Sequence, residues 1–315
     1  MTRRVLVTGG AGFVGSHLVD RLVADGEDVI VYDNLSAGKR SNIDKSARLI
    51  VGDILDTDLL ADVVAQVDSI VHLAAIVSVQ ECTLNWFGSH KVNLIGAMNV
   101  FHAAARAGNI PVVYASSAAV YGNQPHGFCQ ETCTPMPVSA YAADKLGCEH
   151  QARAMAEAYG LPTVGLRFFN VYGARQDLTS PYAGVITKFT ANRIANSPHT
   201  IFGQGLQSRD FIHVDDIVEG IIRAGSYLGT SRRPAVFNLC TGTATTVRQV
   251  ADILDIISGR EQNEIHYAAA RHGDVMLSYG CLRLARTHLG FSTLIDIETG
   301  LRSLWSSMTG QEATS

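Results

Sequence analysis

Glycines near the amino terminus have the spacing of a loop that binds a diphosphate. Gly10, Gly12 and Gly15 fit the pattern G-x-G-x-x-G, and starting from Gly9 gives G-x-x-G-x-x-G. The apolar run Val5–Val7 precedes them, and a helix-like segment follows. Glycine allows a tight turn and a close approach of phosphate to the backbone, while a helix start offers free N–H groups and a positive dipole end. In this strand–loop–helix context the pattern predicts a dinucleotide-binding loop rather than an ordinary turn.

Acidic residues follow the next two apolar runs. Asp33 ends the second run, where a carboxylate suits the ribose hydroxyls of NAD and would repel the extra phosphate of NADP. Lys39 and Arg40 follow closely and leave NADP open as an alternative. Asp53 and Ile54, after the third run, either flank an adenine or form a plain turn with a helix cap.

A tyrosine and a lysine four residues apart could supply acid–base chemistry. Tyr141 and Lys145 fall in a predicted helix, so their side chains share one face. A free phenol, with a pKa of about 10, is a poor base at neutral pH. A neighbouring ammonium and a positively charged nicotinamide ring both favour the phenolate. Ser116 and Ser117 end the fifth apolar run, where ligands bind in parallel sheets, so a hydroxyl there can reach the same substrate oxygen.

The first half of the chain alternates short apolar runs with helical patterns. Runs rich in Val, Ile and Leu without clean alternation are typical of strands buried on both faces. Strands are predicted at Arg4–Thr8, Asp28–Tyr32, Arg48–Val51, Ser69–Leu73, Pro111–Ser116 and Thr163–Phe168, and helices at Gly12–Ala24, Thr57–Val64, Thr83–Ala107 and Tyr141–Tyr159. This alternation predicts an α/β fold with a doubly wound parallel sheet.

After about residue 173 the pattern loosens into a smaller mixed α/β domain that closes over the first. We expect helices near Tyr182–Asn196, Val214–Tyr227, Val247–Ser258 and Cys281–Leu289, and strands near Thr200–Phe202 and Ala235–Leu239. The predicted domains are therefore residues 1–172 and 173–315, with an approximate boundary and some crossing back of the chain.

Composition excludes several classes of protein. The chain has 315 residues, 47% of them hydrophobic and 17% charged, with a net charge of −4. A mildly acidic chain without long Lys/Arg runs does not suit nucleic-acid binding. No apolar run approaches 18 residues, so we expect no membrane span, and the start of the chain does not resemble an export signal. A cytoplasmic location with reduced cysteines follows as an expectation. The spacing of His and Cys predicts no metal site.

Ordered sequence blocks across nearly the whole chain resemble the extended short-chain dehydrogenase/reductases, and among them the UDP-glucose 4-epimerase group of the NAD-dependent epimerase/dehydratase family. The blocks are Thr8–Gly15, Asp33–Leu35, Gly52–Asp53, His72–Ala75, Asn93 with Gly96, Ser116–Gly122, Tyr141 with Lys145, Arg167–Gly173, Arg209–Asp216 and Arg271–Asp274. The resemblance implies a Rossmann-like first domain that binds NAD and a second domain that binds a nucleotide sugar.

The resemblance also implies roles for individual residues. The catalytic set would be Ser117, Tyr141 and Lys145. NAD would contact Gly9, Gly12, Phe13, Val14, Gly15, Asp33, Asn34, Asp53, Ile54, Leu73, Ala74, Ala75, Asn93, Ser116, Tyr141, Lys145 and Phe168. The substrate would contact Ser117, Asn170, Phe202, Arg209, Arg271, Asp274 and Ser278, with the two arginines on its phosphates.

The implied reaction inverts the C4 hydroxyl of a UDP-hexose through a 4-keto intermediate. Related enzymes that are 4,6-dehydratases commonly carry Thr-Asp-Glu where this chain has Ser117-Ala118-Ala119, so elimination lacks a general acid and base here. A dehydratase, a sugar-acid epimerase or decarboxylase, and a non-catalytic NAD sensor remain the alternatives. Two positions depart from the group: Ala140 replaces a common proline, and Asp144 replaces a common Ser or Thr beside Lys145.

Two further expectations concern the substrate and the assembly. In the resembling enzymes a bulky Tyr four residues after the R-x-G-D block restricts the sugar pocket. This chain has Ser278 there, which predicts room for an N-acetyl group. A homodimer is expected through Thr83–Ala107 and the alanine-rich helix Tyr141–Tyr159.

Overall fold

A large parallel sheet forms the first part of the molecule. In the computed structural model, which describes residues 2–177, 184–270 and 275–310, this sheet has seven strands in the order β12-β7-β5-β4-β1-β2-β3. Every pairing within it is parallel. The strands are β1 (Arg4–Thr8), β2 (Asp28–Asp33), β3 (Arg48–Val51), β4 (Ser69–His72), β5 (Val112–Ser117), β7 (Thr163–Phe168) and β12 (Ala235–Leu239). The predicted doubly wound sheet is thus confirmed.

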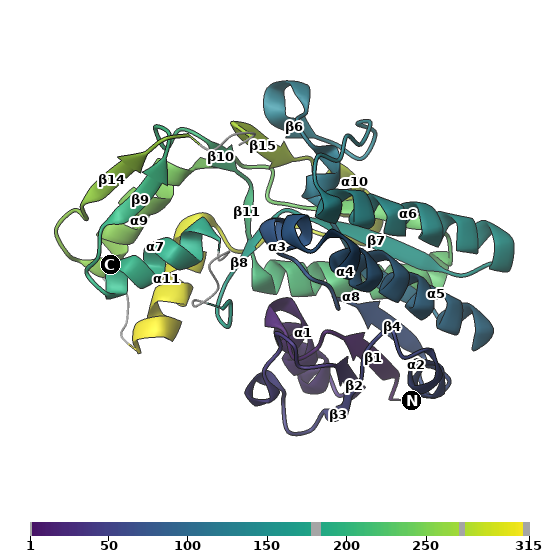
Figure 1. Ribbon diagram of the computed structural model, residues 1–315. Coiled ribbons are helices and arrows are strands. Elements are labelled where there is room, and N and C mark those ends of the chain that lie inside the picture. The colour runs from purple at the N-terminus through teal and green to yellow at the C-terminus, as the bar shows by residue number, and fades with distance from the viewer. Residues whose placement is uncertain (1, 178–183, 271–274, 311–315) are drawn as a thin grey trace.

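Helices cover both faces of this sheet (Figure 1). One apolar core lies under α1, α8 and α10, and a second lies under α2, α5 and α6. Their bounds are α1 (Phe13–Ala24), α2 (Thr57–Val64), α5 (Ala97–Arg106), α6 (Ala140–Tyr159), α8 (Val214–Ser231) and α10 (Arg283–Leu289). The strand order reverses between β1 and β4, and ligands of such sheets bind at the carboxyl ends of the strands at this switch point.

The predicted single helix Thr83–Ala107 is wrong. The segment contains α3 (Val79–Leu84), α4 (Trp86–His90), a π-helical stretch Lys91–Gly96, and α5. Asn85 breaks the path because its backbone leaves the helical region and its side chain caps α4 through the Gly88 N–H. Asn and other short polar side chains compete for backbone groups in this way, which apolar periodicity does not reveal.

The second part is built from short strands and three helices packed on a core of their own. The helices are α7 (Val185–Ile194), α9 (Val247–Ser258) and α11 (Ile297–Thr309). The strands are β6 (Phe128–Cys129), β8 (Asn170–Tyr172), β9 (His199–Phe202), β10 (Ser208–Arg209), β11 (Phe211–His213), β13 (Thr245–Thr246), β14 (Ile265–Ala268) and β15 (Leu277–Gly280). Among the described residues they form one four-stranded sheet, β13-β10-β15-β6, and the pairs β11-β8 and β14-β9.

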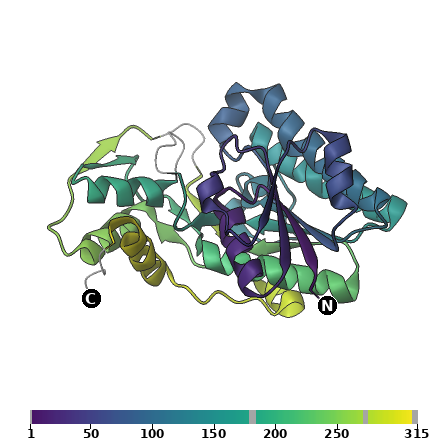
Figure 2. The same ribbon diagram turned by 90° about the horizontal axis from the view of Figure 1, so that it is seen from below.

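The chain passes between the two parts more than once. Although α8 and β12 come late in the sequence, β12 pairs with β7 as an edge strand of the large sheet. After α10 the chain runs to α11 in the second part, along the lower edge of the view in Figure 2. Of the residues that we expected in the smaller mixed domain, from 173 onward, α8, β12 and α10 thus pack with the first part. Residues 182–183 of the helix predicted at Tyr182–Asn196 lie outside the described residues.

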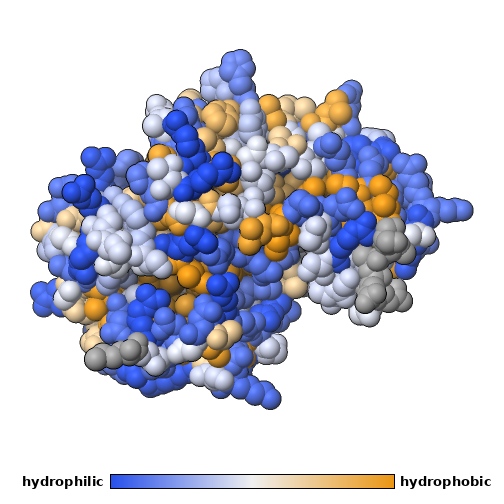
Figure 3. Space-filling view, turned by 180° about the vertical axis from the view of Figure 1, so that it is seen from behind, coloured by the Kyte–Doolittle hydropathy of each residue, from blue (hydrophilic) through white to orange (hydrophobic). Residues whose placement is uncertain are grey.

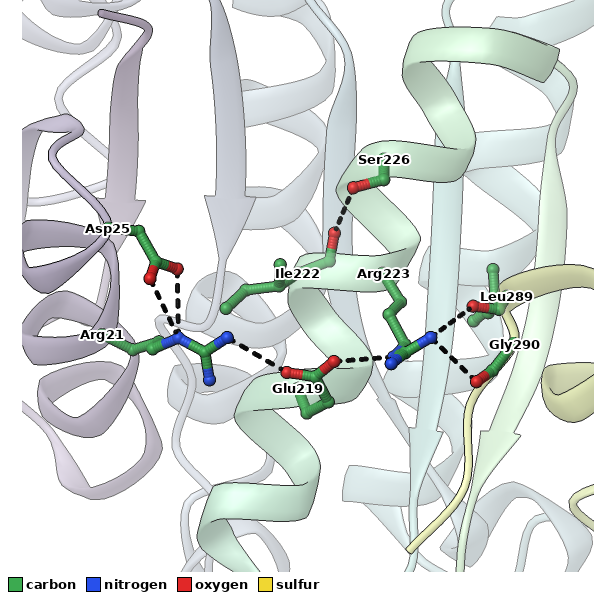
Figure 4. A network of polar contacts seen from close by, with 8 residues as sticks. All are labelled: Arg21, Asp25, Glu219, Ile222, Arg223, Ser226, Leu289 and Gly290. Atoms are coloured by element: carbon green, nitrogen blue, oxygen red, sulfur yellow. Dashed lines mark hydrogen bonds and ion pairs between the residues drawn. The ribbon is translucent and has the colours of Figure 1, made fainter.

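Polar contacts on the surface join these helices across the rear face. Arg21 of α1 contacts Asp25 at 3.0 Å and Glu219 of α8 at 3.3 Å, and Arg223 donates to Glu219 at 2.7 Å (Figure 4). Arg223 also donates to the Gly290 carbonyl after α10 at 2.8 Å. Seen from behind, the surface is largely hydrophilic, with hydrophobic residues in separate patches (Figure 3). No helix in the described part of the chain is long and apolar enough to cross a bilayer.

Candidate active site

The glycine loop joins β1 to α1 as predicted, and its geometry leaves the start of the helix open. Gly9 adopts the left-handed φ of +71°, and a Cβ there would lie 2.7 Å from the Ala74 backbone nitrogen. Gly12 is the N-cap of α1 and has no side chain to occupy the first-turn N–H groups of Phe13 and Val14. An uncapped helix start beneath a glycine turn is a cradle for a diphosphate. The loop therefore fits the pyrophosphate of a dinucleotide.

Asp33 supports this loop from the end of β2. Its carboxylate accepts hydrogen bonds from the Ala11 N–H at 3.0 Å and the Leu35 N–H at 2.8 Å, and the side chain is buried. Each carboxylate oxygen has a second lone pair, so both can still accept from ribose hydroxyls. Asp53, beyond β3, accepts from the Asn34 side chain at 3.1 Å.

The residues expected to bind NAD gather at one edge of the large sheet. Most lie at the carboxyl end of a strand or directly after it: Gly9 after β1, Asp33 and Asn34 at β2, Asp53 and Ile54 after β3, Leu73, Ala74 and Ala75 after β4, Ser116 on β5, and Phe168 on β7. Asn93 differs, because its buried amide hydrogen-bonds both the N–H and the carbonyl of Ile76. Asn93 thus holds the loop that follows Ala74 and Ala75.

Tyr141 and Lys145 lie on the face of α6 that meets β5. Ser139 starts this helix by accepting the Ala142 N–H at 3.2 Å. Lys145 is 4% exposed; its Nζ lies 5.7 Å from the centre of the Tyr141 ring and donates to the Ala115 carbonyl at 2.9 Å. Ser117 lies two residues after Ala115 and accepts the Ala119 N–H, which starts the 3₁₀ turn Ala118–Tyr121 against α6. The three proposed catalytic residues therefore come from neighbouring elements.

Asp144, the departure beside Lys145, points away from the site. Its carboxylate is buried and contacts Nδ1 of His90 on α4 at 2.7 Å, whereas Lys145 faces β5. Adjacent helical side chains were expected to diverge, and here they do. The carboxylate of Asp144 consequently bonds His90 rather than Lys145.

His72 introduces a titratable group behind the site that the sequence patterns did not single out chemically. It ends β4, contacts the Thr8 hydroxyl through Nδ1 at 2.7 Å, and is buried. Burial, followed by the charge of Lys145, lowers the pKa of His72 to about 3. His72 is therefore neutral at physiological pH and adds no charge beside the lysine.

The small sheets bring together the residues expected to bind substrate. Arg209 of β10 lies directly opposite Ser278 of β15, and its guanidinium donates to the Val275 carbonyl at 2.5 Å. Asn170 of β8 donates from its backbone and its side chain to the carbonyl of Asp210. Phe202 ends β9. Arg271 and Asp274 lie outside the described residues.

Comparison with known proteins places this arrangement in a family. The model of the NAD dependent epimerase/dehydratase family matches residues 5–240, which include the glycine loop and the Tyr141–Lys145 pair. The chain belongs to this family. A UDP-glucose 4-epimerase of Mycolicibacterium smegmatis is 35% identical, with 95% of this chain and 96% of that protein covered.

Solved structures of epimerases share the whole fold. The crystal structure of a Thermotoga maritima UDP-glucose 4-epimerase with UDP-glucose has a TM-score of 0.91 and 33% identity, covering 98% of this chain and 99% of that chain. A UDP-N-acetylglucosamine 4-epimerase from Methanobrevibacter ruminantium, in complex with UDP-N-acetylmuramic acid, has a TM-score of 0.92 and 33% identity at the same coverage. The family resemblance and the fold class predicted from sequence are both confirmed.

Sequence reasoning missed a buried carboxylate that joins β10, β15 and the loop after β12 in this epimerase-family chain. Asp210 is fully buried and accepts four hydrogen bonds, from the N–H and hydroxyl of Thr241 and the N–H groups of Gly242 and Gly280. Burial raises the pKa of Asp210, and these hydrogen bonds oppose the rise. Asp210 also donates its own N–H to the Ser278 carbonyl. An acid directly after Arg209 was the available signal, but its partners are distant in sequence.

Proposed function

We propose that this protein is an NAD-dependent 4-epimerase of UDP-hexoses. The observation that carries the proposal is the placement of Tyr141 and Lys145 on α6, against the strand that ends in Ser117 and at the sheet edge that carries the glycine loop. Family membership and the named activities of the relatives support it. The division of labour is part of the proposal: residues 1–172 hold NAD, and residues 173–315 hold the nucleotide sugar.

The chain's own residues supply the acid–base chemistry. Tyr141, as the phenolate, takes the proton from O4 of the sugar, and the Ser117 hydroxyl hydrogen-bonds the same oxygen. The Lys145 ammonium lowers the cost of the phenolate charge. When bound, NAD would supply the acceptor and donor of the C4 hydride, so that the sugar would pass through a 4-keto form. Once the sugar has turned about its diphosphate to present the opposite face of C4, Tyr141 returns the proton to O4, while Asn170 and Arg209 keep the diphosphate in place.

The dehydratase alternative requires a free carboxyl group. Ser117-Ala118-Ala119 provides none, and the buried acids Glu149 and Asp210 are already hydrogen-bonded by protein donors. Glu149 accepts three hydrogen bonds and Asp210 accepts four from protein donors. No observation on the described residues favours elimination over epimerisation.

The test is incubation with UDP-glucose, UDP-N-acetylglucosamine and UDP-glucuronate, followed by separation of the products. We expect 4-epimers of the first two and loss of at least about 100-fold in kcat for Tyr141→Phe, the scale of a lost general base. Tyr159→Phe is the matched control, because its ring is on the same helix but exposed. Release of a 4-keto-6-deoxy sugar, or full activity in Tyr141→Phe, would overturn the proposal.

Acceptance of N-acetylated sugars is the finer part of the proposal. Ser278 lies on the same side of the strand pair as Arg209, and its side chain hydrogen-bonds the Cys129 thiol. The ring of the next residue, Tyr279, packs on Phe128 at 5.3 Å, which supports Ser278 rather than Tyr279 as the gate. Ser278→Tyr should remove the N-acetylated activity selectively; an unchanged ratio of the two activities rules the gate out.

A homodimer is also proposed. The segment before α5 exposes large apolar side chains, with Leu84 81% and Phe87 82% exposed, and Ile95 is partly exposed. Isolated apolar residues are common on surfaces, but a group on adjacent helices favours an interface. We expect a dimer mass by sedimentation at micromolar concentration; a monomer there excludes the pairing through these helices.

A further inference from the structure

A row of polar side chains crosses three buried strands beneath the catalytic helix. Ser116 of β5, Arg167 of β7 and Asn238 of β12 stand opposite one another in register. All three are at most 5% exposed. Glu149 of α6 closes this row from above: its carboxylate accepts from the Ser116 hydroxyl at 2.5 Å and from Nε and Nη2 of Arg167 at 2.9 and 2.6 Å.

Stability does not explain this ion pair well. Removing two charges from water costs several kcal/mol per ion, and apolar pairs of similar volume are often as stable. The pair is nevertheless close: the guanidinium is bidentate to Glu149 through Nε and Nη2 and lies 4.7 Å from the centre of the Tyr121 ring, while its Nη1 is buried without a hydrogen-bond partner among the described residues. Burial would lower the pKa of Arg167, but the hydrogen bonds and charge of Glu149 outweigh it and raise that pKa. Arg167 is thus held charged.

The helix connects this pair to the catalytic residues. Tyr141, Lys145 and Glu149 are spaced by four residues, so they follow one another along one face of α6. Lys145 is bonded to the Ala115 carbonyl and Glu149 to the Ser116 hydroxyl, two consecutive residues of β5. Two polar contacts therefore fix both the rotation and the height of α6 over the strand that ends in Ser117.

The charges around this face are few. Asp144 points the other way, toward His90, and the Glu131 carboxylate accepts the Asn238 N–H at the far end of the row. Burial raises the pKa of the Tyr114 and Tyr121 phenols and of the Cys148 thiol, and it lowers the pKa of the His72 imidazole. All four groups are therefore neutral at physiological pH. With Glu149 and Arg167 opposed in charge, Lys145 is the charged residue of this face of α6 that stands beside the Tyr141 ring, 5.7 Å from its centre.

We propose that Glu149 and Arg167 are a positioning pair: together they seat the catalytic helix on β5, and their opposite charges leave Lys145 to set the acidity of Tyr141. The inference rests on the proposed function for its kinetic consequences. Neither residue touches the substrate in this scheme, and both act through Tyr141 and Lys145.

The charge balance has a definite consequence for the phenol. Glu149→Gln keeps the size of the side chain but leaves the Arg167 guanidinium uncancelled, and arginine stays protonated. Eight residues of helix separate Glu149 from Tyr141 by about 12 Å. A unit charge at that distance changes a pKa by about 0.25 in water and about 1 at an effective dielectric of 20. The pKa of Tyr141 should therefore fall by about 0.25 to 1 in Glu149→Gln.

The experiment titrates Tyr141 in the NAD-bound protein. Phenolate absorbance is followed against pH for each protein, and the signal of the same protein carrying Tyr141→Phe is subtracted; the pH profile of kcat is recorded in parallel. We expect a lowered pKa in Glu149→Gln and a return to the parent value in Glu149→Gln/Arg167→Gln, which removes both charges. Glu149→Asp keeps the charge and should keep the pKa even if it melts earlier. Glu157→Gln, exposed on the same helix, is the control and should change nothing.

The outcomes separate this inference from the proposed function. If the pKa of Tyr141 does not shift in Glu149→Gln, the pair is only structural and the inference is overturned. The same holds if the pKa of Tyr141 shifts further in the double variant than in Glu149→Gln. A shift as large in Glu149→Asp also overturns it. The titration needs no turnover, so the predicted shifts in a protein that epimerises no UDP-sugar would uphold the positioning pair and reject the epimerase.

Discussion

Two glycines of the same loop should fail for different reasons when a methyl group is added. Gly12 has φ −78° and ψ −174°, which any residue adopts, and a Cβ there would meet only the Gly9 carbonyl oxygen at 3.2 Å. At Gly15 a Cβ would lie 2.1 Å from the same oxygen and 2.7 Å from Cα of Gly10, both backbone atoms. The second glycine of such loops lets the diphosphate approach, and the third lets the helix pack on the turn.

The magnitudes follow from these contacts. In Gly12→Ala the loss of unfolded-state entropy stabilises the folded protein by about 0.4–1 kcal/mol. The Gly9 carbonyl must move by a few tenths of an ångström to make room for the methyl group, which offsets much of this gain. The free energy of unfolding should therefore stay within about 0.5 kcal/mol of the parent. The methyl group stands before the first-turn N–H groups, so NAD should bind about tenfold more weakly or worse, equal to 1.4 kcal/mol. Gly15→Ala overpacks backbone against backbone and should cost about 1–3 kcal/mol, or about 2–6 °C in Tm.

The assay combines thermal unfolding of the NAD-free proteins with calorimetric titration of NAD. Gly12→Ala should keep the parent Tm and lose affinity, whereas Gly15→Ala should lose both. The reasoning is refuted if Gly15→Ala melts with the parent, or if Gly12→Ala binds NAD normally.

Three further predictions concern the cofactor, pH and packing. Asp33→Ala should weaken NAD binding and reduce the preference for NAD over NADP, measured by titration with both cofactors. Equal affinity of the parent protein for NAD and NADP would contradict this prediction. Because His72 has a folded pKa of about 3, below its unfolded value, its contribution to stability is complete above about pH 6.5 and is lost as pH falls. Between about pH 6.5 and 4.5, the free energy of unfolding measured in urea should fall by about 2–3 kcal/mol more in the parent than in His72→Asn. Equal decreases in the two proteins would contradict this prediction. Gly225→Ala in α8, whose Cβ meets nothing within 4 Å beside a cavity of about 160 Å³, should stabilise by about 1 kcal/mol. Gly220→Ala should destabilise the protein, because its Cβ would lie 2.4 Å from the Leu239 side chain. A higher Tm for Gly220→Ala than for Gly225→Ala would contradict this reasoning.

Local sequence determined the large sheet and the cofactor edge. The predicted strand Arg4–Thr8 and helix Thr57–Val64 have the same bounds in the structure, because buried parallel strands and amphipathic helices have strong patterns of their own. Glycine spacing and an acid after the next strand identify the loop because the reason for those residues is local: backbone conformation and reach. The Tyr141–Lys145 pair was recognisable for the same reason, since one helical turn sets its geometry.

Tertiary structure decided what depends on partners far apart in the chain. The strands β10 and β13 have two residues each and exist because neighbours supply their hydrogen bonds, so no periodicity could announce them. Asp210 is satisfied by donors more than 30 residues away. Nothing in the sequence around Glu149 singled it out; only the register of β5 with β7 put Ser116 and Arg167 beneath it. A buried charge needs a partner, but the sequence does not say which one the fold will bring.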